Sequence, residues 1–264
     1  MRGTAPITLT CLGTSDAFGS AGCHCAAYVV DTGHARLLFD AGPSVLGAFK
    51  GRGESTESVD AIVISHLHGD HFGGIPFLFL EYTYDSPRHR PLIVVGPPDT
   101  ERRVFDLYRA LYPESANETL PFEVRFVELD QGRVHDVLDA RLEVFRVPHV
   151  KTGISLGLRV RSGGRSLVYS GDTAWTPDLI RESNGCDLFL CECTTFSTPI
   201  PGHVSHADID RHRSSFECSK LLLTHAGREM RARAGEIADT VASDGLRIAI
   251  GGDASIDPAS PGPR

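Results

Sequence analysis

The chain lacks several features that would assign it to broad classes of protein. None of its apolar runs reaches 18 residues, so we expect no membrane-spanning helix. Lysine occurs only three times, and 34 acidic residues outnumber 26 Lys and Arg, which leaves a net charge of −8. A chain of this charge has no overall positive field with which to bind nucleic acid.

Disulfide and secretion signals are also missing. Seven cysteines in 264 residues are an odd number in a chain too long to need a disulfide framework. Residues 1–6 lack the apolar stretch of a secretory signal peptide. We therefore expect a cytoplasmic protein that does not bind membranes. Cys23-His24-Cys25 and Cys191-x-Cys193 lack the usual Cys-x₂-Cys spacing of zinc sites, and we interpret these cysteines as packing residues.

Short apolar, β-rich runs recur along the chain and alternate with helical patterns. Strands are predicted at 7–12, 26–30, 36–39, 61–64, 92–95, 122–127, 142–147, 154–160, 166–169, 188–191, 220–223 and 247–250. Helices are predicted at 43–50, 74–84, 99–112, 176–183, 205–216 and 228–242. No Pro-, Gly- or Ser-rich linker divides the chain, so we expect one α/β domain over residues 1–253, with sheets inside and helices outside, and a disordered tail over 254–264.

Potential metal ligands are concentrated in residues 65–72, Ser-His-Leu-His-Gly-Asp-His-Phe. The stretch places His66, His68, Asp70 and His71 within six residues. The preceding run, 60–65, is a buried-strand pattern that would bring these side chains to the end of a sheet. A solvated, His-rich surface loop would not normally follow so apolar a strand. The pattern therefore favours a metal site.

Three further candidate ligands each follow a predicted strand. His149 comes after 142–147, Asp172 after 166–169 and His225 after 220–223. Each lies where an apolar strand gives way to a turn of small residues, which is a usual position for functional groups on a rigid scaffold. Taken singly, any of the three would more often be structural than a ligand. Their order along the chain makes the joint interpretation much stronger.

Together these residues carry a family resemblance. His66-x-His68-x-Asp70-His71, Pro148-His149, Ser170-Gly171-Asp172-Thr173 and Leu223-Thr224-His225 resemble the metallo-β-lactamase superfamily of metal-dependent hydrolases. The flanking stretches 12–19, 39–42 and 192–196 resemble its ribonuclease Z-like, phosphodiesterase-type branch. The resemblance runs from about residue 7 to residue 253. Its motifs are specific to the superfamily and much less specific to a substrate.

The resemblance implies a four-layer αβ/βα sandwich, in which two mixed β-sheets are flanked by helices, with a two-metal site at one edge. Carried over by residue, His66, His68 and His149 would hold the first metal. Asp70, His71 and His225 would hold the second, and Asp172 would bridge the two. Imidazole and carboxylate ligands suit zinc, with manganese or iron as alternatives. The family also allows a homodimer.

The same resemblance implies hydrolysis by a metal-activated hydroxide. Asp70 would orient the attacking water or accept its proton. His203 resembles the additional histidine that assists phosphodiester cleavage, with His206 as its rival. Glu192 would orient His203, or alternatively be a buried carboxylate bonded to loop amides. Asp40 would support a ligand histidine, or alternatively cap a turn.

The stretch between two ligands bears on the substrate. Members that process transfer RNA carry a long arm between the ligand His and the bridging Asp, whereas the interval from His149 to Asp172 is only 23 residues here. With the acidic net charge, this favours a small or cyclic phosphodiester, a small-molecule anion, over a tRNA precursor. Two alternatives stay open. One is hydrolysis of a lactone, thioester or other acyl substrate, and the other is a non-catalytic metal-binding module.

Overall fold

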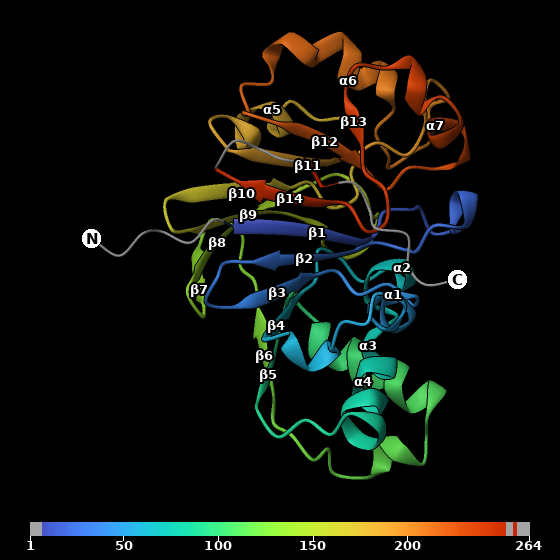
Figure 1. Ribbon diagram of the computed structural model, residues 1–264, viewed down its shortest axis with the longest axis vertical. Coiled ribbons are helices and arrows are strands. Elements are labelled where there is room, and N and C mark those ends of the chain that lie inside the picture. The colour runs from blue at the N-terminus through green and yellow to red at the C-terminus, as the bar shows by residue number, and fades with distance from the viewer. Residues whose placement is uncertain (1–6, 252–255, 258–264) are drawn as a thin grey trace.

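The computed structural model describes residues 7–251 and 256–257, which form two β-sheets packed face to face with helices on both outer sides (Figure 1). The first sheet has eight strands in the order β15-β14-β1-β2-β3-β4-β5-β6. Their bounds are β1 (Ile7–Gly13), β2 (Ala27–Asp31), β3 (Arg36–Phe39), β4 (Ala61–Val63), β5 (Leu92–Gly96), β6 (Val124–Glu128), β14 (Arg247–Ile250) and β15 (Ile256–Asp257). Parallel and antiparallel pairs occur in the same sheet, which is therefore mixed.

The second sheet has seven strands in the order β13-β12-β11-β10-β9-β8-β7 and is also mixed. Its strands are β7 (Val134–Val137), β8 (Ala140–Arg146), β9 (Leu156–Ser162), β10 (Arg165–Tyr169), β11 (Leu188–Glu192), β12 (Leu221–Thr224) and β13 (Thr240–Val241). The α-helices are α1 (Val45–Gly51), α2 (Gly69–Phe72), α3 (Ile75–Leu80), α4 (Thr100–Leu111), α5 (Asp178–Ser183), α6 (His206–His212) and α7 (Arg228–Ala232). The predicted αβ/βα sandwich is thus confirmed.

The alternation of side chains along each strand explains the layers. In β4 and the residue after it, Ala61 and Val63 belong to the apolar core between the sheets, whereas Ile62 and Ile64 pack on the opposite face beneath α1, α3 and α4. In β11, Leu190 faces the core between the sheets, whereas its neighbours on the strand pack against α5, α6 and α7. Strands buried on both faces read as continuous apolar runs, which is why they could be recognised in the sequence.

The connection between β9 and β10 is a tight hairpin. The two strands pair antiparallel from Leu158 opposite Tyr169 to Ser162 opposite Arg165, and the turn holds Gly163 and Gly164, both with positive φ. The short interval between His149 and Asp172 is therefore filled by this hairpin and contains no protruding arm. In the described part of the chain, no helix has both the length and the hydropathy needed to cross a bilayer.

The predicted helix at 228–242 is wrong beyond its first turns. Helix α7 ends at Ala232, a 3₁₀ turn follows at Ala234–Glu236, and Thr240–Val241 form β13 beside β12. Ile237 and Val241 still pack against the core of the second sheet, but from extended chain. Pairing with the sheet overrides the helical spacing of the apolar residues here.

Other boundaries also differ from the predictions. The helix predicted at 74–84 is divided into α3 and a π-helical turn at Glu81–Asp85, and the one at 205–216 into α6 and a 3₁₀ turn at Arg213–Ser215. Strand β7 was not predicted, because its burial alternates weakly at an exposed sheet edge. Two residues of the predicted disordered tail, Ile256 and Asp257, instead pair with β14, and the rest of that tail lies outside the described residues.

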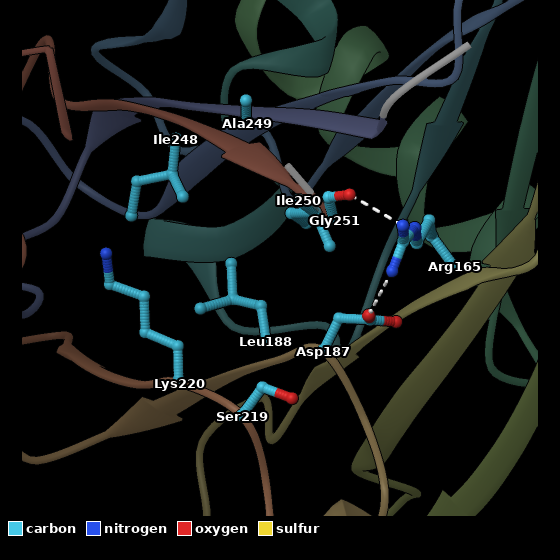
Figure 2. A pocket seen from close by; sticks show the side chains of 9 residues that line it. All are labelled: Arg165, Asp187, Leu188, Ser219, Lys220, Ile248, Ala249, Ile250 and Gly251. Carbon is cyan, nitrogen blue, oxygen red and sulfur yellow. Dashed lines mark hydrogen bonds and ion pairs between the residues drawn. The ribbon is translucent and has the colours of Figure 1, made fainter. Parts of the chain in front are cut away.

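Arg165 is the first residue of β10, and its side chain links the two sheets at the end where this strand begins. Its guanidinium donates one hydrogen bond of 3.2 Å to Asp187, just before β11 of its own sheet, and another of 2.6 Å to the carbonyl oxygen of Gly251, just after β14 of the other sheet. Figure 2 shows these bonds at one end of a cavity of about 480 Å³, with the Lys220 side chain at the other end. The contact therefore links the two sheets at this end of the sandwich.

We predict that Arg165→Leu lowers the free energy of unfolding by about 1 kcal/mol, because a carbonyl and a carboxylate lose a charged donor in a half-exposed position. The matched control is Arg125→Leu in the edge strand β6. It breaks a more exposed ion pair with the nearby Glu123 and should lower the free energy of unfolding by less than about 0.5 kcal/mol. Urea unfolding of both variants measures the difference. Equal destabilisation would show that Arg165 contributes no bond between the sheets.

Candidate metal centre

The candidate ligands come together at one edge of the sandwich, where several strands end. The segment after β4 carries His66 and His68 and leads into the short helix α2 with Asp70 and His71. The other three candidates follow the carboxyl ends of β8, β10 and β12. Because β10 and β12 both run parallel to β11, which lies between them in the sheet, their last residues reach the same edge.

The seven side chains form two compact groups, each able to hold a metal ion. One group consists of His66, His68 and His149, and the other of Asp70, His71, Asp172 and His225. Within each group the candidate ligand atoms lie within 4.8 Å of one another. The structure therefore brings together all seven residues that the sequence singled out, in the partition that the resemblance implied.

Asp172 lies between the two groups. Its Oδ2 is 3.2 Å from Nε2 of His71 and 3.3 Å from Nε2 of His225, and it is 3.9 Å from Nε2 of His149 on the other side. The preceding Gly171 has a φ of +58°, and a Cβ there would lie 2.6 Å from the carbonyl oxygen of Leu156. Only glycine fits the turn that brings Asp172 to this position.

The donor set fits divalent metal ions. Nε2 of His66, Nε2 of His71 and Oδ1 of Asp172 are buried without a hydrogen-bond partner in the described part of the chain, although buried polar atoms normally have one. Burial lowers the pKa of His66 well below its usual range, with the neighbouring His71 adding to the shift, which favours the neutral imidazole that binds metals. Buried carboxylates beside imidazoles are a common set of ligands for zinc.

Asp40 forms hydrogen bonds that hold several residues at this edge of the sandwich. Its carboxylate is fully buried and accepts hydrogen bonds of 2.8 Å from the backbone N–H and the hydroxyl of Ser65, from Nδ1 of His71 and from the hydroxyl of Tyr169. Of the two interpretations of Asp40, the contact with a candidate ligand is the one that the structure shows. By holding Nδ1 of His71, Asp40 leaves Nε2 free for the centre.

Two residues near the centre have a backbone conformation that is unusual for non-glycine residues. Asp40 has a φ of 55° and His225 a φ of 54°. Such left-handed conformations cost free energy and persist only where the surroundings hold them in place. Both occur immediately after strands, at the points where the chain turns its side chains toward the ligand groups.

His203 and Glu192 lie on a third side of the centre. Nδ1 of His203 is 3.1 Å from Oε1 of Glu192, and the His203 ring lies 4.9 Å from the ring of His149 and stacks on that of His225 at 5.5 Å. Burial lowers the pKa of His203, but the hydrogen bond with the Glu192 carboxylate and the negative charges of Glu192 and Asp172 together outweigh it and raise the pKa above the usual value. Glu192 also accepts the backbone N–H of Thr173 at 2.6 Å, so it both contacts His203 and orders the loop that follows Asp172.

His206 lies away from the ligand groups. It is the first residue of α6, and its ring stacks on Phe196 at 5.1 Å. Ser205 caps this helix, and Asp208 completes a capping box with it. None of the four groups of candidate ligands in the described residues contains His206, whereas two of them contain His203. Of the two histidines, His203 is therefore the one that lies beside the candidate ligands.

Sequence reasoning missed the hydroxyl groups around the site. Thr194 lies 3.1 Å from Nδ1 of His203 and 3.1 Å from Nδ1 of His225, and it donates a hydrogen bond of 2.8 Å to Glu192. Tyr169 is buried between the sheets and reaches Asp40 from the second sheet. Nothing in the local pattern distinguishes a strand tyrosine of this kind from one that only packs.

All seven cysteines are free, and no group of candidate ligands in the described residues contains one.

Comparison with known proteins agrees with this geometry. A family model described as Anti-Pycsar protein Apyc1 matches residues 7–241. A ribonuclease Z of Lachnoclostridium phytofermentans is 30% identical over 227 residues, which cover 69% of this chain and 72% of that protein. The uncharacterized protein Rv1339 of Mycobacterium tuberculosis is 32% identical over 225 residues, which cover 83% of this chain and 80% of that protein.

Solved structures share the fold. The metallo-β-lactamase fold protein YhfI of Bacillus subtilis superposes with a TM-score of 0.75 at 21% identity, covering 92% of this chain and 98% of YhfI. The short form of human tRNase Z gives a TM-score of 0.74 at 23% identity, with coverages of 92% and 99%. A diphosphatase from the PhnP family gives 0.73 at 19% identity, with coverages of 95% and 100%.

The family match spans most of the chain. The sequence relatives and the structural neighbours of the chain agree with the same superfamily. The chain therefore belongs to the Anti-Pycsar Apyc1 family, within the ribonuclease Z-like, phosphodiesterase-type branch of the metallo-β-lactamase superfamily, and is a metal-dependent hydrolase.

Proposed function

We propose that this chain hydrolyses small or cyclic phosphodiesters at a centre of two divalent metal ions, for which we expect zinc. The observation that carries the proposal is the pair of ligand groups with Asp172 between them, and with His203 and Glu192 beside them. His66, His68 and His149 would hold one ion, Asp70, His71 and His225 the other, and Asp172 both. Two such ions would lower the pKa of a bound water toward about 7 and would stabilise negative charge on phosphoryl oxygens.

Asp70 is the carboxylate that we assign to the attacking water. Its side chain is 13% exposed, whereas that of Asp172 is 2% exposed, so a solvent molecule reaches Asp70 more readily. Its Oδ2 faces Nε2 of His71 at 3.3 Å and Nε2 of His225 at 3.4 Å. A carboxylate has two oxygens, and binding an ion through one of them leaves the other to orient the water or accept its proton.

His203 is the group that we assign to the leaving oxygen. Glu192 engages its Nδ1 and favours the protonated ring, which leaves the Nε2–H available to donate. As the bond from phosphorus to the leaving oxygen breaks, this proton neutralises the departing alkoxide. The carboxylate of Glu192 would hold the His203 ring in the same orientation before and after this proton transfer.

Several features support a small substrate over a tRNA precursor. The hairpin between β9 and β10 has no arm, and the net charge of the chain is −8. A relative is named ribonuclease Z and a structural neighbour is named a diphosphatase, and these names agree with a phosphate-containing substrate of either size. We propose a small anionic molecule as the substrate, with a homodimer as the form of the protein and no binding to membranes.

We predict that His66→Ala loses bound metal and lowers phosphodiesterase activity at least about 100-fold, because it removes a fully buried candidate ligand. His89→Ala, which removes an exposed histidine from the loop before β5, is the control and should keep both. Elemental analysis and a substrate panel measure the outcome. The panel contains bis(p-nitrophenyl) phosphate, cyclic nucleotides, a tRNA precursor, a lactone and a thioester.

Cleavage of the acyl substrates alone would favour the acyl alternative, and metal binding without any turnover would favour a non-catalytic module. Full activity of His66→Ala would refute the ligand assignment.

For the proton donor, we predict that His203→Ala slows cleavage of a cyclic nucleotide by about 10²- to 10⁴-fold and that of bis(p-nitrophenyl) phosphate by less than about tenfold. An alkoxide leaving group needs a proton, whereas p-nitrophenolate departs without one. His206→Ala serves as the control and should match the wild type on both substrates. An equal loss on the two substrates would contradict the role of His203 as a proton donor.

For the support of the centre, we predict that Asp40→Asn weakens metal affinity by about 10- to 100-fold, because the carboxylate that orients His71 loses its charge. Tyr169→Phe removes one of the bonds to Asp40 but leaves the carboxylate, so its effect should be smaller. Titration of the metal-free protein with zinc compares the variants. Unchanged affinity in Asp40→Asn would mean that Asp40 serves only the packing of the two sheets.

A further inference from the structure

Two of the seven cysteines lie opposite each other where two neighbouring strands begin. Cys186 lies just before β11, and Cys218 lies just before β12. The parallel pairing of these strands places Phe189 opposite Leu221, which is 32 residues further along the chain. Cys186 and Cys218 have the same separation. The register of the sheet, extended toward the start of both strands, therefore sets the two cysteines opposite each other.

Backbone hydrogen bonds continue the pairing around the two cysteines. The N–H of Gly185 donates to the carbonyl oxygen of Glu217 at 3.2 Å. The N–H of Ser219 donates to the carbonyl oxygen of Cys186 at 2.9 Å. These bonds hold the two segments at the spacing of neighbouring strands, about 4.8 Å, which lies within the range of about 4.4–6.8 Å between the Cα atoms of disulfides.

The side chains of the two cysteines lie on the same face of the sheet. Asp187 and Ser219, the residues that follow them, line the cavity in Figure 2, which residues of both sheets surround. Successive side chains of an extended chain point to opposite faces, so the cysteines point toward the helices. Cys186 is fully buried in the apolar cluster beneath α5, α6 and α7, and the partly buried Cys218 packs against that cluster.

The two thiols contact each other and differ in acidity. The Cys186 thiol donates a hydrogen bond to the sulfur of Cys218, and this bond together with burial raises the pKa of Cys186 well above its usual value. The same bond lowers the pKa of Cys218 in spite of its partial burial, and the charge of Arg213 adds to the shift. The pKa of each of the other five cysteines is raised. Cys218 is thus the cysteine whose thiolate forms most readily.

We infer that Cys186 and Cys218 form an oxidisable dithiol, in which hydrogen peroxide converts the accessible Cys218 to a sulfenic acid and the buried Cys186 then closes a reversible disulfide. In the first step the Cys218 thiolate attacks a peroxide oxygen. The S–O bond forms, the O–O bond breaks, and the departing hydroxide takes a proton from solvent to leave as water.

In the second step the sulfur of Cys186 attacks the sulfur of Cys218. The S–S bond forms, the S–O bond breaks, and the departing hydroxide takes the proton of the Cys186 thiol to leave as a second water. Two thiols are thereby oxidised by two electrons to one disulfide, and one molecule of hydrogen peroxide is reduced to two of water.

The disulfide would join β11 and β12 at the ends remote from the candidate metal centre. Strand β11 ends at Glu192, and β12 leads directly to His225. The bond therefore restrains two strands that position the centre without touching a ligand. A disulfide stabilises a protein mainly by restricting its unfolded chain, so we expect the oxidised protein to unfold at a higher temperature than the reduced one. The inference does not depend on which substrate the centre cleaves.

Limited oxidation of the full chain, loaded with zinc, tests the inference. After hydrogen peroxide, the mass of the wild-type protein should fall by that of two hydrogen atoms, and a tryptic map should show one pair of peptides joined through Cys186 and Cys218. The midpoint of thermal unfolding should rise by about 5–10 °C. Dithiothreitol should reverse both changes, and the zinc content should stay the same throughout.

Three variants assign the roles of the two thiols. Cys186→Ser lacks the second thiol, so peroxide should leave a sulfenic acid on Cys218 that dimedone captures, with at least about tenfold more adduct than in the wild type. Cys218→Ser should form neither the disulfide nor an adduct, because Cys186 is buried. Cys23→Ser removes the other partly buried cysteine and should behave as the wild type.

The wild-type peptide map needs no substitution, so it stays decisive if a variant fails to fold. Peroxide that leaves Cys186 and Cys218 unbonded in the wild type, or that joins either of them to Cys23 or to a second chain, would overturn the inference. A Cys186–Cys218 bond that leaves the unfolding midpoint unchanged or lowers it would refute the stabilising role of the bond.

Discussion

A single buried carboxylate, that of Asp40, connects the packing of the two sheets to the geometry of the metal centre. It lies at the end of β3 in the first sheet and accepts bonds from the chain after β4, from a candidate ligand on α2 and from Tyr169 of the second sheet. A charge buried in this way is tolerated only when it is fully hydrogen-bonded. The requirement to satisfy Asp40 therefore fixes the separation of the sheets and the orientation of His71 at the same time.

The electrostatic design of the site follows from its burial. Asp172 and Asp70 lie among imidazoles in a region from which most water is excluded, and they supply fewer negative charges than two divalent ions bring. With two divalent ions bound, as we propose, the centre would be a local positive site within an acidic chain. Such a contrast would favour a small anion at the centre, whereas the rest of the surface would offer little attraction to a long polyanion.

Helices and strands were predicted well where residues close together in the sequence determine the structure, and poorly where contacts with distant residues determine it. Strands such as β3 and β11 are buried on both faces, and their apolar runs identified them almost to the residue. The apolar spacing at 228–242 predicted a long helix, but its second half pairs with β12 or packs as extended chain. Hydrogen bonding to a neighbouring strand decided that segment, and the strand is distant in sequence.

The sequence alone determined the ligand types, their order and their position after strands, because each of these depends on residues adjacent in the chain. It also left His203 and His206 as rivals, and it left Asp40 and Glu192 each with two interpretations. The tertiary structure places His203, and not His206, beside the ligand groups, bonds Asp40 to His71, and gives Glu192 contacts with both His203 and loop amides. The contacts of His203 with Glu192 and of Asp40 with His71 join segments 11 and 31 residues apart. The pair of Cys186 and Cys218 arises in the same way, because only the pairing of β11 with β12 brings together residues 32 positions apart.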